Sequence, residues 1–332
     1  MALRSAVLFG GGFGTQYLKW LKNEAHEAED VVQPLETFGH VLFSLALSMC
    51  FGVKLDDEAY LFPQRWKEML AIRTRLVTNP IPMVQTRAHK MEENKKDGIF
   101  SYADSLLSLD LPGGGKLKES EVTTLCYEFL TAGVSTVVSS LQWAMANLVK
   151  YPDVQAKLFE EIERVTQKNG GVINEEDLKK MPYLKAVILE TLRRHPPIHT
   201  LLPHRVSEDI SLEGYTIPKN TYVNFMLVSM GLDGKVWQDP LEFKAERFMG
   251  GRESVDLTGT REIKMIPFGA GRRVCPGMGL GMFHLEYMVA HLIKEFEWKA
   301  VAGDEVDMAE SMEMDIDYVM KKPLQACIVP RK

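Results

Sequence analysis

The sequence has little cysteine, no excess of basic charge and no long hydrophobic run, and each shortage excludes a class of protein. Four cysteines in 332 residues contain no CxxC pair. This argues against both a disulfide framework and a structural zinc site, and it fits a reducing compartment. The formal net charge is −6 and the basic residues are scattered. We therefore expect no nucleic-acid partner.

The longest apolar run is VLFSLALSMCFGV at Val41–Val53. It is shorter than the roughly 20 residues that a membrane-spanning helix needs, and it is typical of a core helix. The opening residues MALRSAVLFGGGFG lack the pattern of a signal peptide. Gly10–Gly12 lacks the spacing of a dinucleotide-binding loop. No membrane anchor is expected in the chain as given.

Helical periodicity dominates the first two-thirds of the sequence, and strands are few and late. The helices are predicted over Gln16–Ala28, Leu35–Phe51, Pro63–Leu76, Glu119–Lys150, Asp153–Thr166, Tyr183–Arg194 and Met278–Lys294. Residues Ile210–Asn224 alternate around a glycine and a proline, as short antiparallel strands do. The predicted fold is mainly α with a small β part.

The strongest chemical signal is PFGAGRRVCPG at Pro267–Gly277. Its pattern F-x-x-G-x-R-x-C-x-G is formed by Phe268, Gly271, Arg273, Cys275 and Gly277. Gly271 permits a turn, and Gly277 lets a flat macrocycle approach the backbone. The N-terminus of the next helix would favour a thiolate able to hold iron. The alternative, a buried cysteine before a core helix, explains Cys275 but none of its companions.

Three further motifs accompany this loop. Glu190 and Arg193 form E-x-x-R on one helical face, where a surface ion pair is the simpler alternative. The prolines of HPPIHTLLPHRVS at His195–Ser207 end the preceding helix. AGVST at Ala132–Thr136 lies within the longest predicted helix, and AERF at Ala245–Phe248 follows the predicted strands.

With these motifs the sequence resembles the haem-thiolate enzymes of the cytochrome P-450 superfamily, plant microsomal type. There the cysteine loop supplies the proximal ligand of haem iron. The resemblance implies haem b (iron protoporphyrin IX) as cofactor and Cys275 as its metal ligand. The other cofactor-binding residues that it implies are Phe268, Gly271, Gly277, Arg273 and His204. Arg273 and His204 would bind haem propionates, with Arg205 as the rival of His204.

The same resemblance assigns roles to the remaining motifs. AERF matches P-E-R-F with alanine for proline, which implies a buried structural triad of Glu190, Arg193 and Arg247. AGVST is similar to A-G-x-[D/E]-T of the oxygen-activation helix. Gly133 and Thr136 fit a local opening of that helix, but Ser135 stands where the family has a carboxylate, and serine is no general acid at neutral pH. A core helix with no proton relay is the alternative.

The resemblance is close over Glu119–Arg331 and weaker over Gln16–Lys118. It implies a single cytochrome P-450 domain over residues 1–332, lacking the N-terminal third of the family's domain. Pocket-lining residues are expected at Phe129–Ala132, Ile198–Leu202 and Met312–Asp317, mostly apolar.

The implied activity is a monooxygenase that inserts one atom of O2 into a lipophilic small molecule. Electrons would come from NADPH–cytochrome P-450 reductase at the cytosolic face of the endoplasmic reticulum membrane. Two alternatives stay open: a haem-thiolate isomerase or dehydratase, suggested by Ser135, and a non-catalytic truncated fragment that binds haem poorly.

Overall fold

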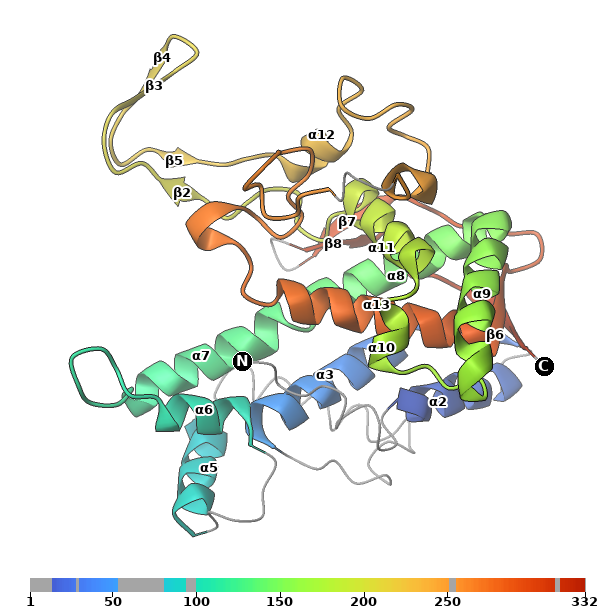
Figure 1. The fold of residues 1–332 in the computed structure, drawn as a ribbon, viewed down its shortest axis with the longest axis horizontal. Helices are drawn as coiled ribbons and strands as arrows, with labels where there is room; N and C mark the ends of the chain where they lie inside the picture. The colour runs from blue at the N-terminus through green and yellow to red at the C-terminus, as the bar shows by residue number, and fades with distance from the viewer. Residues whose placement is uncertain are drawn as a thin grey trace. The chain divides into compact units, whose positions relative to one another are not determined.

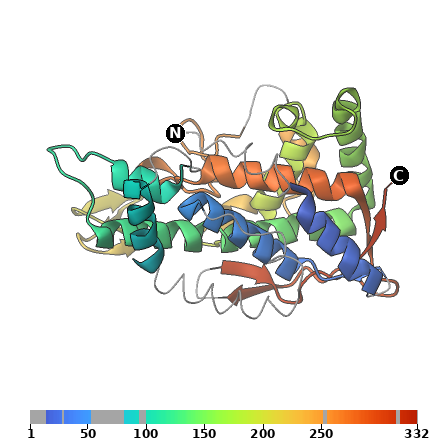
Figure 2. The same cartoon turned by 90° about the horizontal axis from the view of Figure 1, so that it is seen from below.

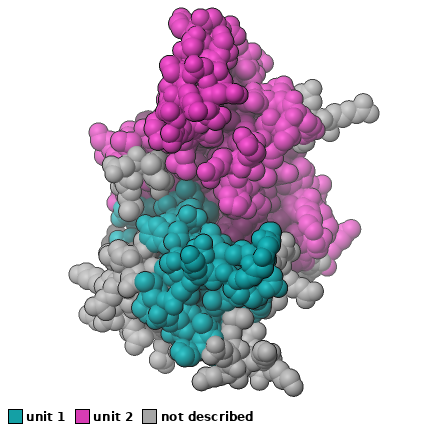
Figure 3. All heavy atoms as spheres, turned by 90° about the vertical axis from the view of Figure 1, so that its left-hand side faces the viewer, with its two compact units in different colours: residues 1–138 teal, residues 139–332 magenta. Residues whose placement is uncertain are grey.

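The computed structural model describes residues 14–27, 30–52, 81–93, 100–250, 255–313 and 317–331. The chain divides into two compact units, residues 1–138 and 139–332, which Figure 3 colours separately. The helix expected at Pro63–Leu76 lies outside the described residues. A single domain over the whole chain stays a prediction.

The first unit is built from helices. Its elements are α2 (Gly14–Glu27), β1 (Val31–Val32), α3 (Leu35–Phe51), α5 (Ile81–Glu93), α6 (Tyr102–Ser108) and α7 (Glu119–Ala132). Helix α3 packs against α2, α5, α6 and α7, and it is one of the two blue helices in Figure 2. Every residue from Phe38 to Phe51 is buried, which confirms that the apolar run is a core helix. Gly52, in the left-handed conformation, ends it.

The long helix predicted over Glu119–Lys150 is interrupted, so that expectation was wrong in detail. Helix α7 ends at Ala132 and α8 (Ser135–Lys150) begins after a turn at Gly133 and Val134. Glycine is a poor helix former because its backbone loses the most entropy on ordering. Taken together, Glu119–Lys150 has the length and apolar composition of a membrane span, which core helices of soluble proteins share.

The second unit contains the other helices. After α8 they are α9 (Pro152–Thr166), η3 (Gln167–Asn169), α10 (Glu175–Leu178), α11 (Pro182–Arg194), α12 (Leu227–Gly231), η4 (Ala245–Phe248), η5 (Gly271–Arg273) and α13 (Met278–Glu295). Pro152 and Pro182 start their helices, where a missing N–H costs nothing. Helix α13 packs against α9, α10 and α11 (Figure 1).

The strands of this unit pair as short antiparallel ladders. The pairs are β2 (His204–Arg205) with β5 (Tyr222–Val223), β3 (Ile210–Leu212) with β4 (Tyr215–Ile217), β6 (Phe296–Ala300) with β9 (Ala326–Pro330), and β7 (Glu310–Glu313) with β8 (Asp317–Met320). Glu213 and Gly214 have positive φ, as a tight hairpin turn requires. The strands predicted over Ile210–Asn224 are confirmed.

Helix α11 is capped from outside its own sequence. The buried carboxylate of Glu161 on α9 accepts hydrogen bonds from the backbone N–H groups of Tyr183 (3.0 Å) and Leu184 (2.9 Å). These are among the first N–H groups of a helix, which have no partner within it. Glu161 therefore fixes where α11 starts against α9.

We predict that Glu161→Ala lowers the free energy of unfolding by about 1–3 kcal/mol, because two buried N–H groups lose a charged acceptor. Urea unfolding checks the value. Glu160→Ala, at an exposed position of the same helix, is the matched control and should change little. Equal effects of the two substitutions would contradict the capping role.

Candidate functional site

The cysteine loop is a tight turn held by its own backbone. Cys275 N–H donates to the Phe268 carbonyl (2.8 Å), and Val274 N–H donates to that of Gly271 (3.2 Å). Gly269 and Gly271 have φ of 74° and 65°, a left-handed conformation that favours glycine. The loop leads directly into α13, so Cys275 lies just before the N-terminus of a long helix.

The thiol of Cys275 differs from the other three in its surroundings. All four cysteines are free, but Cys50 and Cys126 are buried, and hydrogen bonding to Cys126 together with burial raises the pKa of the Cys50 thiol. Cys327 lies within strand β9 and is half-buried. Cys275 alone of the four is exposed. It is the thiol that an external metal can reach.

The glycines around Cys275 leave room on the outer side of the loop. A Cβ on Gly271 would have no protein atom within 4 Å, and one on Gly277 would lie 3.8 Å from Cys275 Sγ. The φ of Gly277 is −90°, so its backbone does not require glycine. The ring of Phe268 lies along the first turn of α13, where a Cβ on Gly281 would be 3.7 Å from Cε1.

The basic residues expected at the site differ in how many contacts they make with other groups of the protein. Arg273 is exposed, and within the described residues it has no ion-pair partner. The Arg205 guanidinium binds Asn220 Oδ1 through two contacts, at 3.0 and 2.6 Å. His204 Nδ1 lies 2.7 Å from the Leu202 carbonyl oxygen, and the His204 ring meets Phe225 edge-on. Of the two candidates for binding a propionate, Arg205 therefore makes more side-chain hydrogen bonds within the protein.

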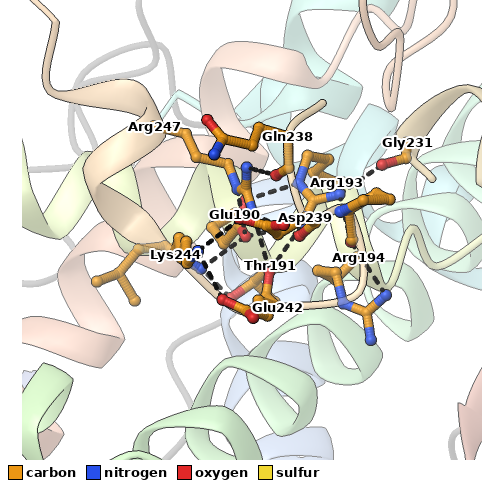
Figure 4. A network of polar contacts seen from close by, with 12 residues as sticks. Glu190, Thr191, Arg193, Arg194, Gly231, Gln238, Asp239, Glu242, Lys244 and Arg247 are labelled. Carbon is orange, nitrogen blue, oxygen red and sulfur yellow. Dashed lines mark hydrogen bonds and ion pairs between the residues drawn. The ribbon is translucent and has the colours of Figure 1, made fainter. Parts of the chain in front are cut away.

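Glu190, Arg193 and Arg247 are brought together (Figure 4). Arg193 binds the Glu190 carboxylate at both oxygens, with Nε–Oε2 of 2.7 Å and Nη2–Oε1 of 2.8 Å. Arg247 Nε reaches Oε1 at 3.2 Å. The side chains of Glu190 and Arg193 are fully buried, and that of Arg247 is 10% exposed.

Backbone carbonyls satisfy the remaining donors of this network. Arg193 donates to the carbonyls of Gly231, Pro240 (2.9 Å) and Glu242 (3.2 Å). Arg247 donates to the carbonyls of Gln238 and Asp239 (2.7 Å). Lys244 N–H completes the shell of Glu190 at 2.8 Å. The network thereby fastens the whole segment 231–247 to α11.

In the first unit, the turn between α7 and α8 groups Gly133, Ser135 and Thr136. A Cβ on Gly133 would come within 2.6 Å of the Phe129 carbonyl oxygen, so a side chain there forces the backbone to move. Thr136 Oγ1 donates to the Ala132 carbonyl at 2.9 Å, whereas Ser135 Oγ lies 3.5 Å from that of Thr131. The threonine hydroxyl thus satisfies a carbonyl at the interruption, and the serine makes only a long contact.

Comparison with known proteins gives the family. The sequence model of the Cytochrome P450 family matches residues 33–328. The chain belongs to the cytochrome P450 family. It is 42% identical to Cytochrome P450 89A9 of Arabidopsis thaliana over 94% of this chain and 68% of that protein. It is 43% identical to Cytochrome P450 98A1 of Sorghum bicolor over 65% of this chain and 41% of that protein.

A third relative is the flavonoid 3'-monooxygenase of Arabidopsis thaliana, at 38% identity over 68% of this chain and 45% of that protein. The chain thus spans between 41% and 68% of the length of these three relatives. The mainly α architecture with small sheets described above is that of a P450 domain.

P450 membership implies a haem cofactor, and the residues of the cysteine loop fit one. The thiol of Cys275 is free and exposed, and the Cβ position on Gly271 faces open space. Arg273 supplies an exposed cation that can pair with a carboxylate. Among the described residues no atom lies within 4 Å of the Cβ position on Gly271, which leaves space for a planar group beside the loop.

Two sets of contacts could not be predicted from sequence motifs. The carbonyls that hold Arg193 and Arg247 carry no sequence signal, because any residue has a carbonyl. Glu310, on β7, contacts both His195 and His199. A single glutamate in a short strand gives no pattern that would have revealed it.

We predict that Gly231→Ala destabilises the protein, because its Cβ would overlap the main-chain carbonyl oxygen of Arg193 and displace a partner of the buried guanidinium. The expected loss of unfolding free energy is about 1–3 kcal/mol. Gly234→Ala, with no atom within 4 Å of its Cβ, is the control. A thermal midpoint lowered equally in both variants would contradict the proposed contact.

Proposed function

We propose that this chain provides the haem-thiolate centre of a P450 monooxygenase that inserts one atom of O2 into a lipophilic small molecule. Cys275 carries the proposal, as the exposed free thiol at the end of a glycine-shaped turn before α13. The flavonoid 3'-monooxygenase among the relatives supports the reaction class. A haem b bound there would supply the activation of dioxygen and O–O cleavage that thiolate ligation favours.

The other residues hold and orient. Arg273 and His204 are proposed to bind the propionates, and Phe268, Gly271 and Gly277 to shape the surface beside the macrocycle. Glu190, Arg193 and Arg247 are proposed to hold the fold behind the loop, since a buried ion network fixes geometry and is costly to break one member at a time. Gly133 and Thr136 are proposed to form the opening over the haem.

Electrons are proposed to come from NADPH–cytochrome P-450 reductase, at the cytosolic face of the endoplasmic reticulum membrane. Both proposals rest on the likeness to plant microsomal members. The apolar residues of Ile198–Leu202 support a lipophilic substrate. Of the remaining pocket-lining expectations, Met314–Ile316 lie outside the described residues.

The first test concerns the iron ligand. Reduced protein treated with carbon monoxide should show the red-shifted Soret band typical of thiolate-ligated haem, and Cys275→Ser should abolish it, because an alcohol does not replace the thiolate. Cys327→Ser, which removes a half-buried thiol from β9, is the control and should keep the band. A band that persists in Cys275→Ser would overturn the assignment. Absence of the band from the unsubstituted chain loaded with haem would favour the non-catalytic fragment.

The second test concerns proton delivery at Ser135. A hydroxyl can pass on a hydrogen bond but is no general acid near neutral pH, so we expect reductant consumption poorly coupled to product, with hydrogen peroxide released. Ser135→Asp should raise the product formed per reductant consumed by supplying a group that exchanges protons. Ser135→Asn is the control, because asparagine has nearly the same shape as aspartate but does not exchange protons.

Tight coupling in the unsubstituted enzyme, or equal coupling in the aspartate and asparagine variants, would defeat the relay argument. Turnover of a lipid hydroperoxide without reductant would favour the second candidate, an isomerase or dehydratase. The long Ser135 contact in place of a carboxylate is the observation behind that candidate.

A further inference from the structure

A carboxylate bridges two histidines in the second unit. Glu310 Oε1 lies 3.0 Å from His195 Nδ1, and Oε2 lies 3.2 Å from His199 Nε2. The first contact has hydrogen-bond geometry, and the second is a close approach without aligned geometry. The side chains of the histidines are 6% and 11% exposed, against 28% for Glu310. One strand residue thus contacts both ends of the segment His195–His199.

Aromatic rings enclose this cluster. The His195 ring stacks on Trp143 of α8, with centroids 4.1 Å apart and an interplanar angle of 2°. The His199 ring stacks on Tyr318 of β8, with centroids 3.3 Å apart. The two stacks fix the planes of both imidazole rings beside Glu310.

Backbone hydrogen bonds extend the cluster along the chain. Tyr318 N–H donates to the Pro197 carbonyl (2.8 Å), and the Tyr318 carbonyl accepts from Ser139 Oγ (2.7 Å). Leu227 N–H donates to the His199 carbonyl (2.8 Å), and Leu201 N–H to that of Phe225 (2.9 Å). The course of residues 197–201 is therefore set from β8 on one side and from the start of α12 on the other.

We propose that Glu310 is a positioning residue that holds the segment Pro197–Leu201 in place as a wall of the substrate pocket. The inference rests on the proposed function, which assigns Ile198–Leu202 to the pocket. Glu310 acts through His195 and His199 and need not touch substrate. Its place on β7 couples the wall to the β7–β8 hairpin.

The charges indicate how the contacts of Glu310 with His195 and His199, here called the clamp, respond to pH. Burial raises the pKa of Glu310, but its contacts with His195 and His199 outweigh burial and bring the pKa to about 2, so Glu310 is ionised near neutral pH. Burial lowers the pKa of His195, and Glu310 offsets this only in part. Arg194 on α11 also faces His195 and disfavours its protonation.

The direction of the pH dependence follows from the linkage between protonation of His195 and opening of the clamp. Because the pKa of buried His195 lies below that of an exposed imidazole, an open state takes up protons more readily as pH falls below about 6.5. The clamp should loosen with acid. Without Glu310 the pKa of His195 falls further, so loosening per unit of pH should become steeper.

Hydrogen exchange of the haem-loaded chain tests the clamp. In Glu310→Gln the amides of Tyr318, Leu201 and Leu227 should exchange on the order of tenfold faster near neutral pH, since a charged acceptor of a buried donor is lost. Their protection should fall more steeply from about pH 7 to about pH 5 than in the unsubstituted protein, after correction for intrinsic exchange. Glu305→Gln, at an exposed position of the same unit, is the matched control.

Azole binding tests whether the clamp shapes the pocket. Imidazole needs room only at the iron, whereas 4-phenylimidazole also needs a pocket wall. In Glu310→Gln the Kd of 4-phenylimidazole should rise several-fold while that of imidazole stays unchanged. His199→Phe can keep the stack on Tyr318 without the ring nitrogen, and it should change both the exchange rates and the Kd of 4-phenylimidazole in the same direction as Glu310→Gln.

Each adverse result has one meaning. Unchanged exchange in Glu310→Gln overturns the clamp. Faster exchange at every pH with no change in slope, or with no change in either azole Kd, reduces Glu310 to a general structural residue and overturns the positioning role. A chain that never shows the thiolate-type carbonyl band defeats the proposed function instead, and the exchange data still decide the clamp.

Discussion

The second unit depends on one buried carboxylate shared by two arginines. Taking Glu190 and Arg193 out of water costs several kcal/mol per ion, and pairing restores that only when the remaining donors and acceptors are also satisfied. Here they are satisfied, because the guanidinium groups reach carbonyls of Gly231, Pro240 and Glu242 in addition to Glu190. The cost of leaving any of these groups unpaired fixes the course of an otherwise irregular segment.

That constraint reaches the cysteine loop through packing. Helix α11, which carries Glu190 and Arg193, packs against α13, and Cys275 lies two residues before Gly277, the N-cap of α13. Glu161 sets the start of α11, and the ion network holds its end. Helix α11 is therefore fixed at both ends, and its packing against α13 sets the direction in which the loop meets α13. The glycines of the loop decide only its local turn.

Motifs predicted much of this arrangement, and most of the remainder depends on contacts between residues far apart in the sequence. Helices α9, α11 and α13 lie within one residue of their expected bounds, because amphipathic spacing and proline starts are local signals. The resemblance implied a local opening at Gly133 and Thr136, whereas periodicity alone marked no helix boundary there, because one glycine within a long apolar pattern is often tolerated. The partners of Arg193 were not predictable at all, since they are carbonyls more than thirty positions away. His199 and Glu310 are likewise separated by a long stretch of chain that only the fold closes.

Two ionic clusters thus hold successive parts of the chain, the end of α11 and the segment that follows it. The two clusters differ in chemistry. At the end of α11, Glu190 meets guanidinium groups, which stay charged at every pH at which the protein is folded. Beyond it, Glu310 meets imidazoles, and burial lowers the pKa of the one in His195. The first cluster suits a permanent anchor for the helix behind the cysteine loop, and the second suits an attachment that yields under mild acid. Because Glu190 is paired with guanidinium groups and not with imidazoles, acid that loosens the segment Pro197–Leu201 should leave α11, and with it the position of Cys275, undisturbed.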